Sequence, residues 1–301
     1  MLPPGETLND RLDGLDAVVL DCDGVLWHGE RPIAGSVAAV RELRARGKRV
    51  VFVTNNSSKA RGAYVEKFAR LGFDGVGLDD ILAPGYAAAR YLQASGASGR
   101  VHVLGMGGVT EELQAAGFEV VDAVDHGGYA PAGYTVTADE FEGIRLCDGV
   151  GAVVVGYDPC MSYRKVCYAS LYLQQPGTLF VATNMDGGDV IGGRLMPGAG
   201  AMVRAVEAAS AREVDLVAGK PSAWMAELLR EQGVDPETMM VLGDRLDTDI
   251  AFGRAAGASL CVLPLSGVAT WKDVKAAKRA GRFGECPDLV VPTLALALGI
   301  L

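Results

Sequence analysis

The stretch VVLDCDGVLW, residues 18–27, ends an apolar run in two aspartates that are separated by one cysteine. Side chains alternate along a strand, so Asp21 and Asp23 face the same way as the chain leaves the sheet. Open parallel sheets bind their ligands at the carboxyl ends of their strands. Two like charges this close need a cation or a shared proton. The stretch therefore predicts a buried strand followed by a ligand site that contains positive charge.

The same alternation of short apolar runs and helical segments continues along the chain, as is typical of a parallel α/β sheet. The segments between the runs carry apolar residues at helical spacing and end in glycine, which favours helix termination. Strands are predicted at 17–21, 49–53, 214–218, 239–243 and 259–263.

The middle of the chain has strand and helix candidates of its own, for example GAVVVGYD at 151–158. This pattern predicts a second α/β unit inserted into the first. We therefore expect a Rossmann-like parallel sheet as the core domain, formed by 1–97 and 197–301. The inserted domain, called the cap, is expected at 98–196.

Composition excludes several classes of protein. A formal charge of -9 argues against nucleic acid and anionic membrane surfaces as partners, because both favour basic patches. No stretch approaches the ~20 consecutive apolar residues of a membrane span, and the first residues lack the basic and apolar regions of a signal peptide. The six cysteines show no Cys-x-x-Cys spacing, so we expect free thiols and a cytoplasmic protein.

Polar residues also follow the other predicted strands. Thr54, Asn55 and Asn56 come after 49–53 and suit a phosphate oxygen, although such a cluster alone is an ordinary helix cap. Lys220 stands where a strand gives way to a helix, a position at which a lone lysine is usually solvated. After 239–243 come three acids, more than capping needs, which suit a hard cation: Asp244, Asp247 and Asp249. Their joint occurrence at strand ends points to one site.

These groups allow phosphoryl transfer. A carboxylate nucleophile forms an aspartyl-phosphate and so divides one displacement into two easier ones. Mg²⁺ suits such a site because it binds through one or two carboxylates and substrate phosphate. The second aspartate is placed to protonate the leaving alkoxide and later to deprotonate water. Other motifs fit poorly: GKPS is not a P-loop, VLGMGGVT lacks the third glycine of a dinucleotide loop, and there is no G-x-S-x-G elbow.

The four motifs, in order, resemble those of the haloacid dehalogenase superfamily of phosphatases: Asp21-Cys-Asp23-Gly-Val, Thr54-Asn-Asn, Gly219-Lys220-Pro and Gly243-Asp244-Arg-Leu-Asp247-Thr-Asp249. The resemblance implies that Asp21 is the nucleophile and Asp23 the acid/base. It implies that Thr54, Asn55, Asn56 and Lys220 bind phosphate. It further implies that Mg²⁺ is held by Asp21, the backbone carbonyl of Asp23 and Asp244, with Asp249 as outer-shell support.

The insertion follows the second motif, since 166 positions separate Thr54 from Lys220. Its segments VVVGYDPCMSYRK, YLQQPG and ATNMD are similar to those of eukaryotic phosphoglycolate phosphatases, also described as 4-nitrophenylphosphatases. Related pyridoxal phosphate phosphatases carry a histidine in the loop after TN, and the loop at 185–198 has none. The resemblance implies that the core domain is catalytic, that the cap determines substrate specificity and that a homodimer forms through the cap. Tyr157, Asn184 and Asp186 are candidates for substrate contacts.

The leading hypothesis is therefore a Mg²⁺-dependent phosphatase of a small phosphorylated metabolite, with 2-phosphoglycolate as the expected substrate. A pyridoxal phosphate phosphatase is the alternative with the same chemistry. A phosphomutase, which would return the phosphoryl group to a sugar, and a binding module without catalysis are the alternatives from other classes.

Overall fold

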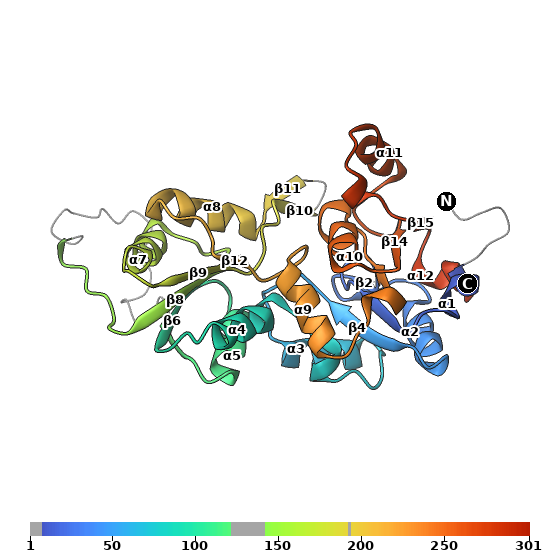
Figure 1. Ribbon diagram of the computed structural model, residues 1–301, viewed down its shortest axis with the longest axis horizontal. Coiled ribbons are helices and arrows are strands. Elements are labelled where there is room, and N and C mark those ends of the chain that lie inside the picture. Colours follow the sequence, from blue (N-terminus) through green and yellow to red (C-terminus); the bar gives the residue numbers. More distant parts are fainter. Residues whose placement is uncertain (1–7, 122–141, 192–193) are drawn as a thin grey trace. The chain divides into compact units, whose positions relative to one another are not determined.

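The computed structural model describes residues 8–121, 142–191 and 194–301, which form two compact units (Figure 1). The core unit contains the described residues up to Thr54 together with Arg61–Ala83 and Lys220–Leu301. The cap unit contains Asn55–Ala60 and the described residues of Pro84–Gly219. The domain limits expected from the sequence, 98–196 for the insertion, stay a prediction.

The core unit is built on a parallel sheet, as the apolar runs predict. Every strand pair described in this six-stranded sheet is parallel. The strands in their order across the sheet are β15 (Leu289–Val291), β14 (Leu260–Pro264), β13 (Met239–Leu242), β1 (Ala17–Leu20), β4 (Arg49–Val53) and β5 (Ile81–Leu82). A short antiparallel hairpin, β2 (Trp27–His28) and β3 (Arg31–Pro32), follows β1.

Helices and helical turns connect these strands. The α-helices are α1 (Leu8–Leu12), α2 (Ser36–Ala45), α3 (Arg61–Arg70), α9 (Ala223–Glu231), α10 (Ala251–Ala256), α11 (Trp271–Arg279) and α12 (Leu294–Ala297). The short turns are η1 (Leu78–Asp80), η2 (Pro236–Thr238), η3 (Leu246–Ile250) and η4 (Phe283–Glu285), of which η3 is a π-helical turn. The segments at 35–47, 58–72 and 221–233 carry apolar residues at helical spacing, and the helices predicted there form as α2, α3 and α9.

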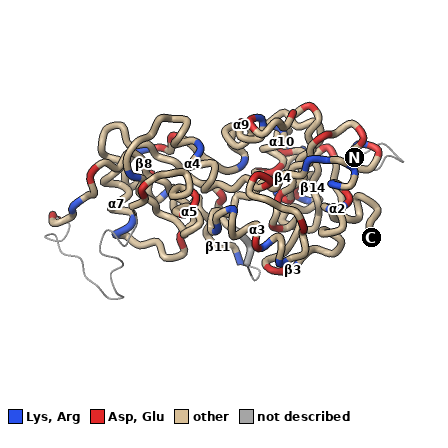
Figure 2. Tube along the Cα trace, turned by 90° about the horizontal axis from the view of Figure 1, so that it is seen from below, with Lys and Arg blue, Asp and Glu red and all other residues tan. Residues whose placement is uncertain are grey.

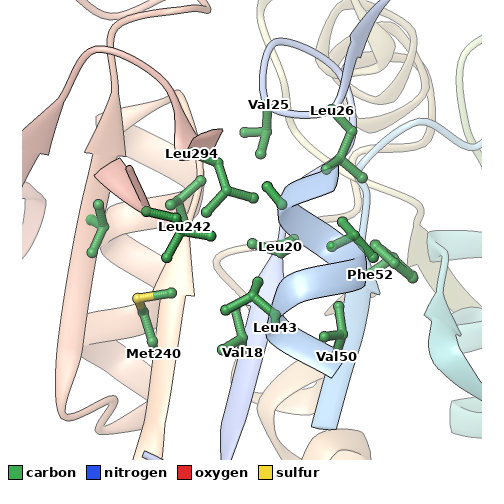
Figure 3. Close-up of a cluster of buried hydrophobic side chains, with 14 of the residues drawn as sticks. Val18, Leu20, Val25, Leu26, Leu43, Val50, Phe52, Met240, Leu242 and Leu294 are labelled. Carbon is green, nitrogen blue, oxygen red and sulfur yellow. The ribbon is translucent and has the colours of Figure 1, made fainter. Parts of the chain in front are cut away.

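One face of the core sheet packs on α2 and α12 to make an apolar core. The side chains of Val18 and Leu20 on β1 both point to this face. Met240 and Leu242 of β13 lie beside them (Figure 3). The intervening strand residues, such as Val19, are also buried. Burial on both faces explains why these strands read as continuous apolar runs rather than as alternating ones.

The cap unit has a second parallel sheet (Figure 1). Its strands in spatial order are β12 (Leu216–Val217), β9 (Leu179–Ala182), β8 (Val150–Val155), β6 (Arg100–Leu104) and β7 (Glu119–Val121). Its helices are α4 (Pro84–Ala94), α5 (Gly107–Ala115), α7 (Tyr163–Leu173) and α8 (Ala199–Ser210). The antiparallel hairpin β10 (Gly188–Ile191) and β11 (Arg194–Pro197) lies between β9 and α8 in the chain. The parallel α/β fold class expected from the sequence is confirmed.

Charged residues of both signs are interspersed along the described chain (Figure 2). Among the described helices, none combines the length and the apolar character that a membrane span requires. All six cysteines fall within the described ranges and are free. Cys22, between the two aspartates, is fully buried in the apolar core.

Candidate active site

Three neighbouring strands end in the residues that the sequence singled out. Asp21 follows β1, Thr54 follows β4, and Gly243 and Asp244 follow β13. Leu20 lies opposite Leu242 on one side and Phe52 on the other, and the backbone N–H of Asp21 donates to the Leu242 carbonyl at 2.9 Å. Parallel register therefore brings these residues to one edge of the sheet, where such folds bind ligands.

Lys220 is the buried cation of this edge. Its side chain is only 3% exposed, and its Nζ donates to Asp21 Oδ1 at 2.6 Å, to Asp249 Oδ1 at 2.5 Å and to the Val53 carbonyl at 2.7 Å. Burial opposes its charge, but the carboxylates of Asp21 and Asp249 outweigh burial and raise the pKa of the ammonium above its usual range. Lys220 therefore stays charged and fixes the positions of two carboxylates.

Asp21, Asp244 and Asp249 form an acidic cluster in which one carboxylate oxygen of each lies within 4.8 Å of the others. Burial raises the pKa of Asp21 well above its usual value; Lys220 opposes this, and Asp249 and Asp244 add to it. Burial, followed by the charge of Asp249, raises the pKa of Asp244 to about 7. Three buried carboxylates facing one lysine leave excess negative charge, and the hard oxygen donors fit a divalent cation.

Backbone groups and two glycines hold Asp244 in place. Its Oδ2 accepts from the backbone N–H of Val268 at 2.7 Å. A Cβ atom at Gly267 would lie 1.9 Å from this oxygen, and one at Gly24 would lie 2.3 Å from it. Only glycine therefore leaves room for the Asp244 carboxylate at these two positions.

The turn η3 holds Asp249. The backbone N–H of Arg245 donates to Asp249 Oδ2 at 3.0 Å, while Oδ1 accepts from Lys220. Both oxygens thus have protein donors, which suits a supporting role better than direct coordination. Asp247, by contrast, is exposed and pairs with Arg245 at 2.9 Å, outside the cluster.

Two partners of the predicted residues were not identified from the sequence. The indole N–H of Trp27 donates to Asp23 Oδ1 at 2.9 Å. The hydroxyls of Tyr64 and Thr54 share a hydrogen bond, and both residues are buried. Trp27 lies within the opening motif and Tyr64 on the helix after the second motif, so proximity in sequence was the only available signal.

The cap unit holds Asn55 in a network of its own. Asn55 Nδ2 donates to both carboxylate oxygens of Asp186, at 3.1 and 3.2 Å, and its carbonyl accepts from Asn184 Nδ2 at 2.7 Å. Asn184 Oδ1 accepts from the Asp186 backbone N–H at 3.0 Å. A Cβ atom at Gly219 would lie 2.6 Å from Asn55 Oδ1. Asn184 and Asp186 therefore fix the side chain of Asn55.

Two further candidates have structural partners. Asn56 is exposed, and its Oδ1 accepts from the Ser58 backbone N–H at 3.0 Å, which closes a local turn. Tyr157 is half-buried, and its carbonyl accepts from the Met106 backbone N–H at 3.1 Å. The structure thus brings Asp21, Lys220, Asp244 and Asp249 together in the core unit, and Asn55, Asn184 and Asp186 together in the cap unit.

Two segments of the chain match models of known protein families. A haloacid dehalogenase-like hydrolase model matches residues 18–119, and a HAD-hydrolase-like model matches 217–297. These matches cover the segments that supply the acidic cluster and Lys220.

Curated relatives cover most of the chain. Human glycerol-3-phosphate phosphatase is 41% identical over 296 residues, which span 94% of this chain and 90% of that protein. Phosphoglycolate phosphatase 2 of Arabidopsis thaliana is 42% identical over 261 residues, spanning 85% of this chain and 84% of that protein. A solved p-nitrophenyl phosphatase from Archaeoglobus fulgidus aligns with a TM-score of 0.78 and 30% identity, over 95% of this chain and 99% of that one. The chain therefore belongs to the haloacid dehalogenase-like hydrolase family, and within that family to the phosphatases.

Proposed function

We propose that this phosphatase is a Mg²⁺-dependent phosphomonoester hydrolase that forms an aspartyl-phosphate on Asp21 and acts on a small phosphorylated metabolite. The observation that carries the proposal is the placement of Lys220 between Asp21 and Asp249, beside Asp244, at the carboxyl ends of β1, β4 and β13. A fixed cation beside a carboxylate nucleophile is what a phosphate dianion requires for approach.

The metal ligands in this proposal are Asp21, Asp244 and the backbone carbonyl of Asp23. Asp249 supports them by holding Lys220 and by accepting from the Arg245 backbone. Bound Mg²⁺ would supply charge neutralisation of the phosphate oxygens and of the crowded carboxylates.

The side chains of the site then divide the tasks of the reaction among them. Lys220, Thr54, Asn55 and Asn56 bind the phosphate oxygens, and Asp21 attacks phosphorus. As the bond from phosphorus to the leaving oxygen breaks, protonated Asp23 gives its proton to that oxygen and releases the alcohol. In the second half, Asp23 takes a proton from water, the water oxygen attacks phosphorus, and the bond to Asp21 breaks to release phosphate.

We propose 2-phosphoglycolate as the first substrate to test, since the cap segments resemble phosphoglycolate phosphatases and relatives from Arabidopsis thaliana carry that name. Glycerol 3-phosphate is the second candidate, because human glycerol-3-phosphate phosphatase aligns over 90% of its own length. Pyridoxal phosphate is the third, and the loop at 185–198 lacks the histidine expected for it. The named relatives are phosphatases, and none supports a phosphomutase or a binding module.

The test compares kcat/KM for these three phosphoesters with Mg²⁺ and with EDTA. The proposal predicts Mg²⁺-dependent phosphate release and the highest kcat/KM for 2-phosphoglycolate. A higher kcat/KM for glycerol 3-phosphate would mean that this compound, and not 2-phosphoglycolate, is the preferred substrate, and would leave the proposed mechanism unchanged. Absence of phosphate release from every small phosphoester would overturn the proposed function itself. We further propose a cytoplasmic homodimer formed through the cap, which sedimentation and fractionation would test.

The raised pKa of Asp244 predicts how stability depends on pH without metal. Its pKa rises from an ordinary 3.8 to about 7, so the stability linked to its proton is present below about pH 4 and is lost as pH rises through 7. A divalent cation replaces that proton. Saturating Mg²⁺ should therefore raise the melting temperature more at about pH 8 than at about pH 5.

Thermal unfolding with Mg²⁺ and with EDTA at both pH values measures this difference. Asp244→Asn is the matched variant, because it keeps the side-chain shape and removes the titrating group. Its melting temperature should respond weakly to Mg²⁺ at either pH. An equal Mg²⁺ effect on the wild type at both pH values would contradict this part of the account.

A further inference from the structure

Trp27 lies directly against the side chain proposed as the acid/base. Its indole Nε1–H donates to Asp23 Oδ1 at 2.9 Å. The backbone makes this contact possible, because the Cys22 carbonyl accepts from the N–H groups of Leu26 at 2.8 Å and Trp27 at 3.3 Å and so turns the chain back on itself. Trp27 and Asp23 thereby form an isolated bridge between residues four positions apart.

Packing fixes the orientation of the indole. Trp27 is fully buried, with the Phe68 ring 4.9 Å away and the Phe73 ring 5.9 Å away, both edge to face. Such aromatic contacts restrict ring rotation. The indole N–H therefore points at Asp23 before any substrate arrives.

A buried cation covers the face of the same ring. Lys67 Nζ lies 4.2 Å from the Trp27 ring centroid, and Lys67 is only 5% exposed. A cation over an indole attracts the electrons of the ring and makes its N–H a stronger donor. Lys67 and Phe68 are adjacent on α3, so one helix supplies both the ring packing and the charge.

We propose that Trp27 is a positioning residue for Asp23: its N–H holds Oδ1 and so fixes the orientation of the carboxyl group that exchanges the proton with the leaving group and with water. The inference rests on the proposed function, in which Asp23 is the acid/base. Trp27 itself touches neither substrate nor phosphorus in this account.

If Trp27 positions Asp23, the loss of kcat/KM on removal of the indole N–H should depend on the leaving group of the substrate. In the first half of the reaction, the bond between phosphorus and the leaving oxygen breaks while the Asp23 proton moves to that oxygen. An alkoxide needs this proton, whereas 4-nitrophenolate is a stable anion and leaves without it. Because kcat/KM reports the steps up to the first irreversible one, it isolates this half from the later attack of water.

The experiment measures kcat/KM for 2-phosphoglycolate, glycerol 3-phosphate and 4-nitrophenyl phosphate. The decisive variant carries benzothienylalanine in place of Trp27, which keeps the bicyclic shape and replaces the N–H with sulfur. Trp27→Phe is the second, genetically encoded variant. We expect kcat/KM for the better alkyl substrate to fall about 10- to 100-fold, and that for 4-nitrophenyl phosphate to fall less than about threefold.

Phe73→Leu is the matched control, because it loosens the same aromatic cluster and leaves the N–H bond in place. It should lower the melting temperature while the ratio of the two kcat/KM values stays at the wild-type value. Lys67→Met keeps the length of the side chain and removes the charge, and it should lower the alkyl value by a smaller factor than loss of the N–H does.

An equal loss for both kinds of substrate in the benzothienylalanine variant would overturn the positioning role and leave Trp27 as a packing residue. Unchanged kcat/KM values would overturn it as well. A wild-type protein that hydrolyses neither kind of substrate would instead mean that the proposed function has failed, so the two failures are distinguishable.

Discussion

Asp21→Asn is expected to lower kcat by on the order of 10³-fold or more with every substrate, because an amide cannot attack phosphorus to form the covalent intermediate. Asparagine keeps the size of the side chain and one carbonyl oxygen, so the bond from Lys220 Nζ to Oδ1 is retained in form. Circular dichroism should show a folded protein. The loss should appear in kcat with saturating substrate and saturating Mg²⁺, so that weaker binding of either does not explain it.

Asp247→Asn is the matched control for this change. Asp247 stands in the fourth motif, but its side chain is 59% exposed and pairs only with Arg245 among the contacts described for it. The activity of the Asp247→Asn variant should stay within about twofold of wild type, since an exposed ion pair contributes little. Turnover by Asp21→Asn close to that of Asp247→Asn would exclude Asp21 as the nucleophile.

Lys220→Met should produce the second largest effect, on both activity and stability. Methionine fills a similar volume, but Asp21 and Asp249 lose their shared cation and the Val53 carbonyl loses a donor. Removing one partner of a buried ion pair costs about 3–5 kcal/mol of unfolding free energy. We also expect kcat/KM to fall about 100-fold or more, because a fixed positive charge on the phosphate is lost.

Urea unfolding and phosphate release measure the two effects. Lys48→Met is the control, since Lys48 also donates to a backbone carbonyl, that of Leu15 at 2.7 Å, and no carboxylate is among its described partners. Mg²⁺ should restore part of the stability of Lys220→Met, because it neutralises the same carboxylates. If Lys220→Met matched Lys48→Met in both measurements, the buried cation would have no role in the site.

Four of the six core strands, β1, β4, β13 and β14, were predictable because they are buried on both faces, whereas the short strands β5 and β15 were not predicted. Runs such as 49–53 then show no alternation, and the chain leaves them through polar residues at known positions. The strand expected at 214–218 is present as β12, but it pairs with β9 in the cap unit. An apolar run indicates that a strand forms and says nothing about its neighbour, since pairing depends on contacts distant in sequence.

The residues of the acidic cluster were predictable for a similar reason: parallel strands bring their carboxyl ends to one edge. The groups that orient these residues were not. The Val268 N–H that holds Asp244 and the Gly267 that leaves it space lie in the loop after β14, where no pattern marks them. The sequence around Trp27 also did not show that its indole N–H donates a hydrogen bond to Asp23, because the same residues are typical of an ordinary aromatic side chain in a core.

The cap candidates show a further limit of the sequence. Asn184 and Asp186 were selected as substrate contacts, and that role stays a prediction. Both residues form hydrogen bonds with Asn55, whose amide is proposed to bind phosphate. Residues that are far apart in the chain can be selected as candidates for one site without their contacts being predictable, because a hydrogen bond depends on a few tenths of an ångström.

The most direct measurement of the central claim is a rapid acid quench during turnover of 2-phosphoglycolate, or of the better alkyl substrate, followed by mass spectrometry of the digested protein. The account predicts a transient phosphoryl group on the peptide that contains Asp21, absent from Asp21→Asn and lost on longer incubation. A phosphoryl group on another residue, or turnover with no covalent intermediate at any quench time, would contradict the account.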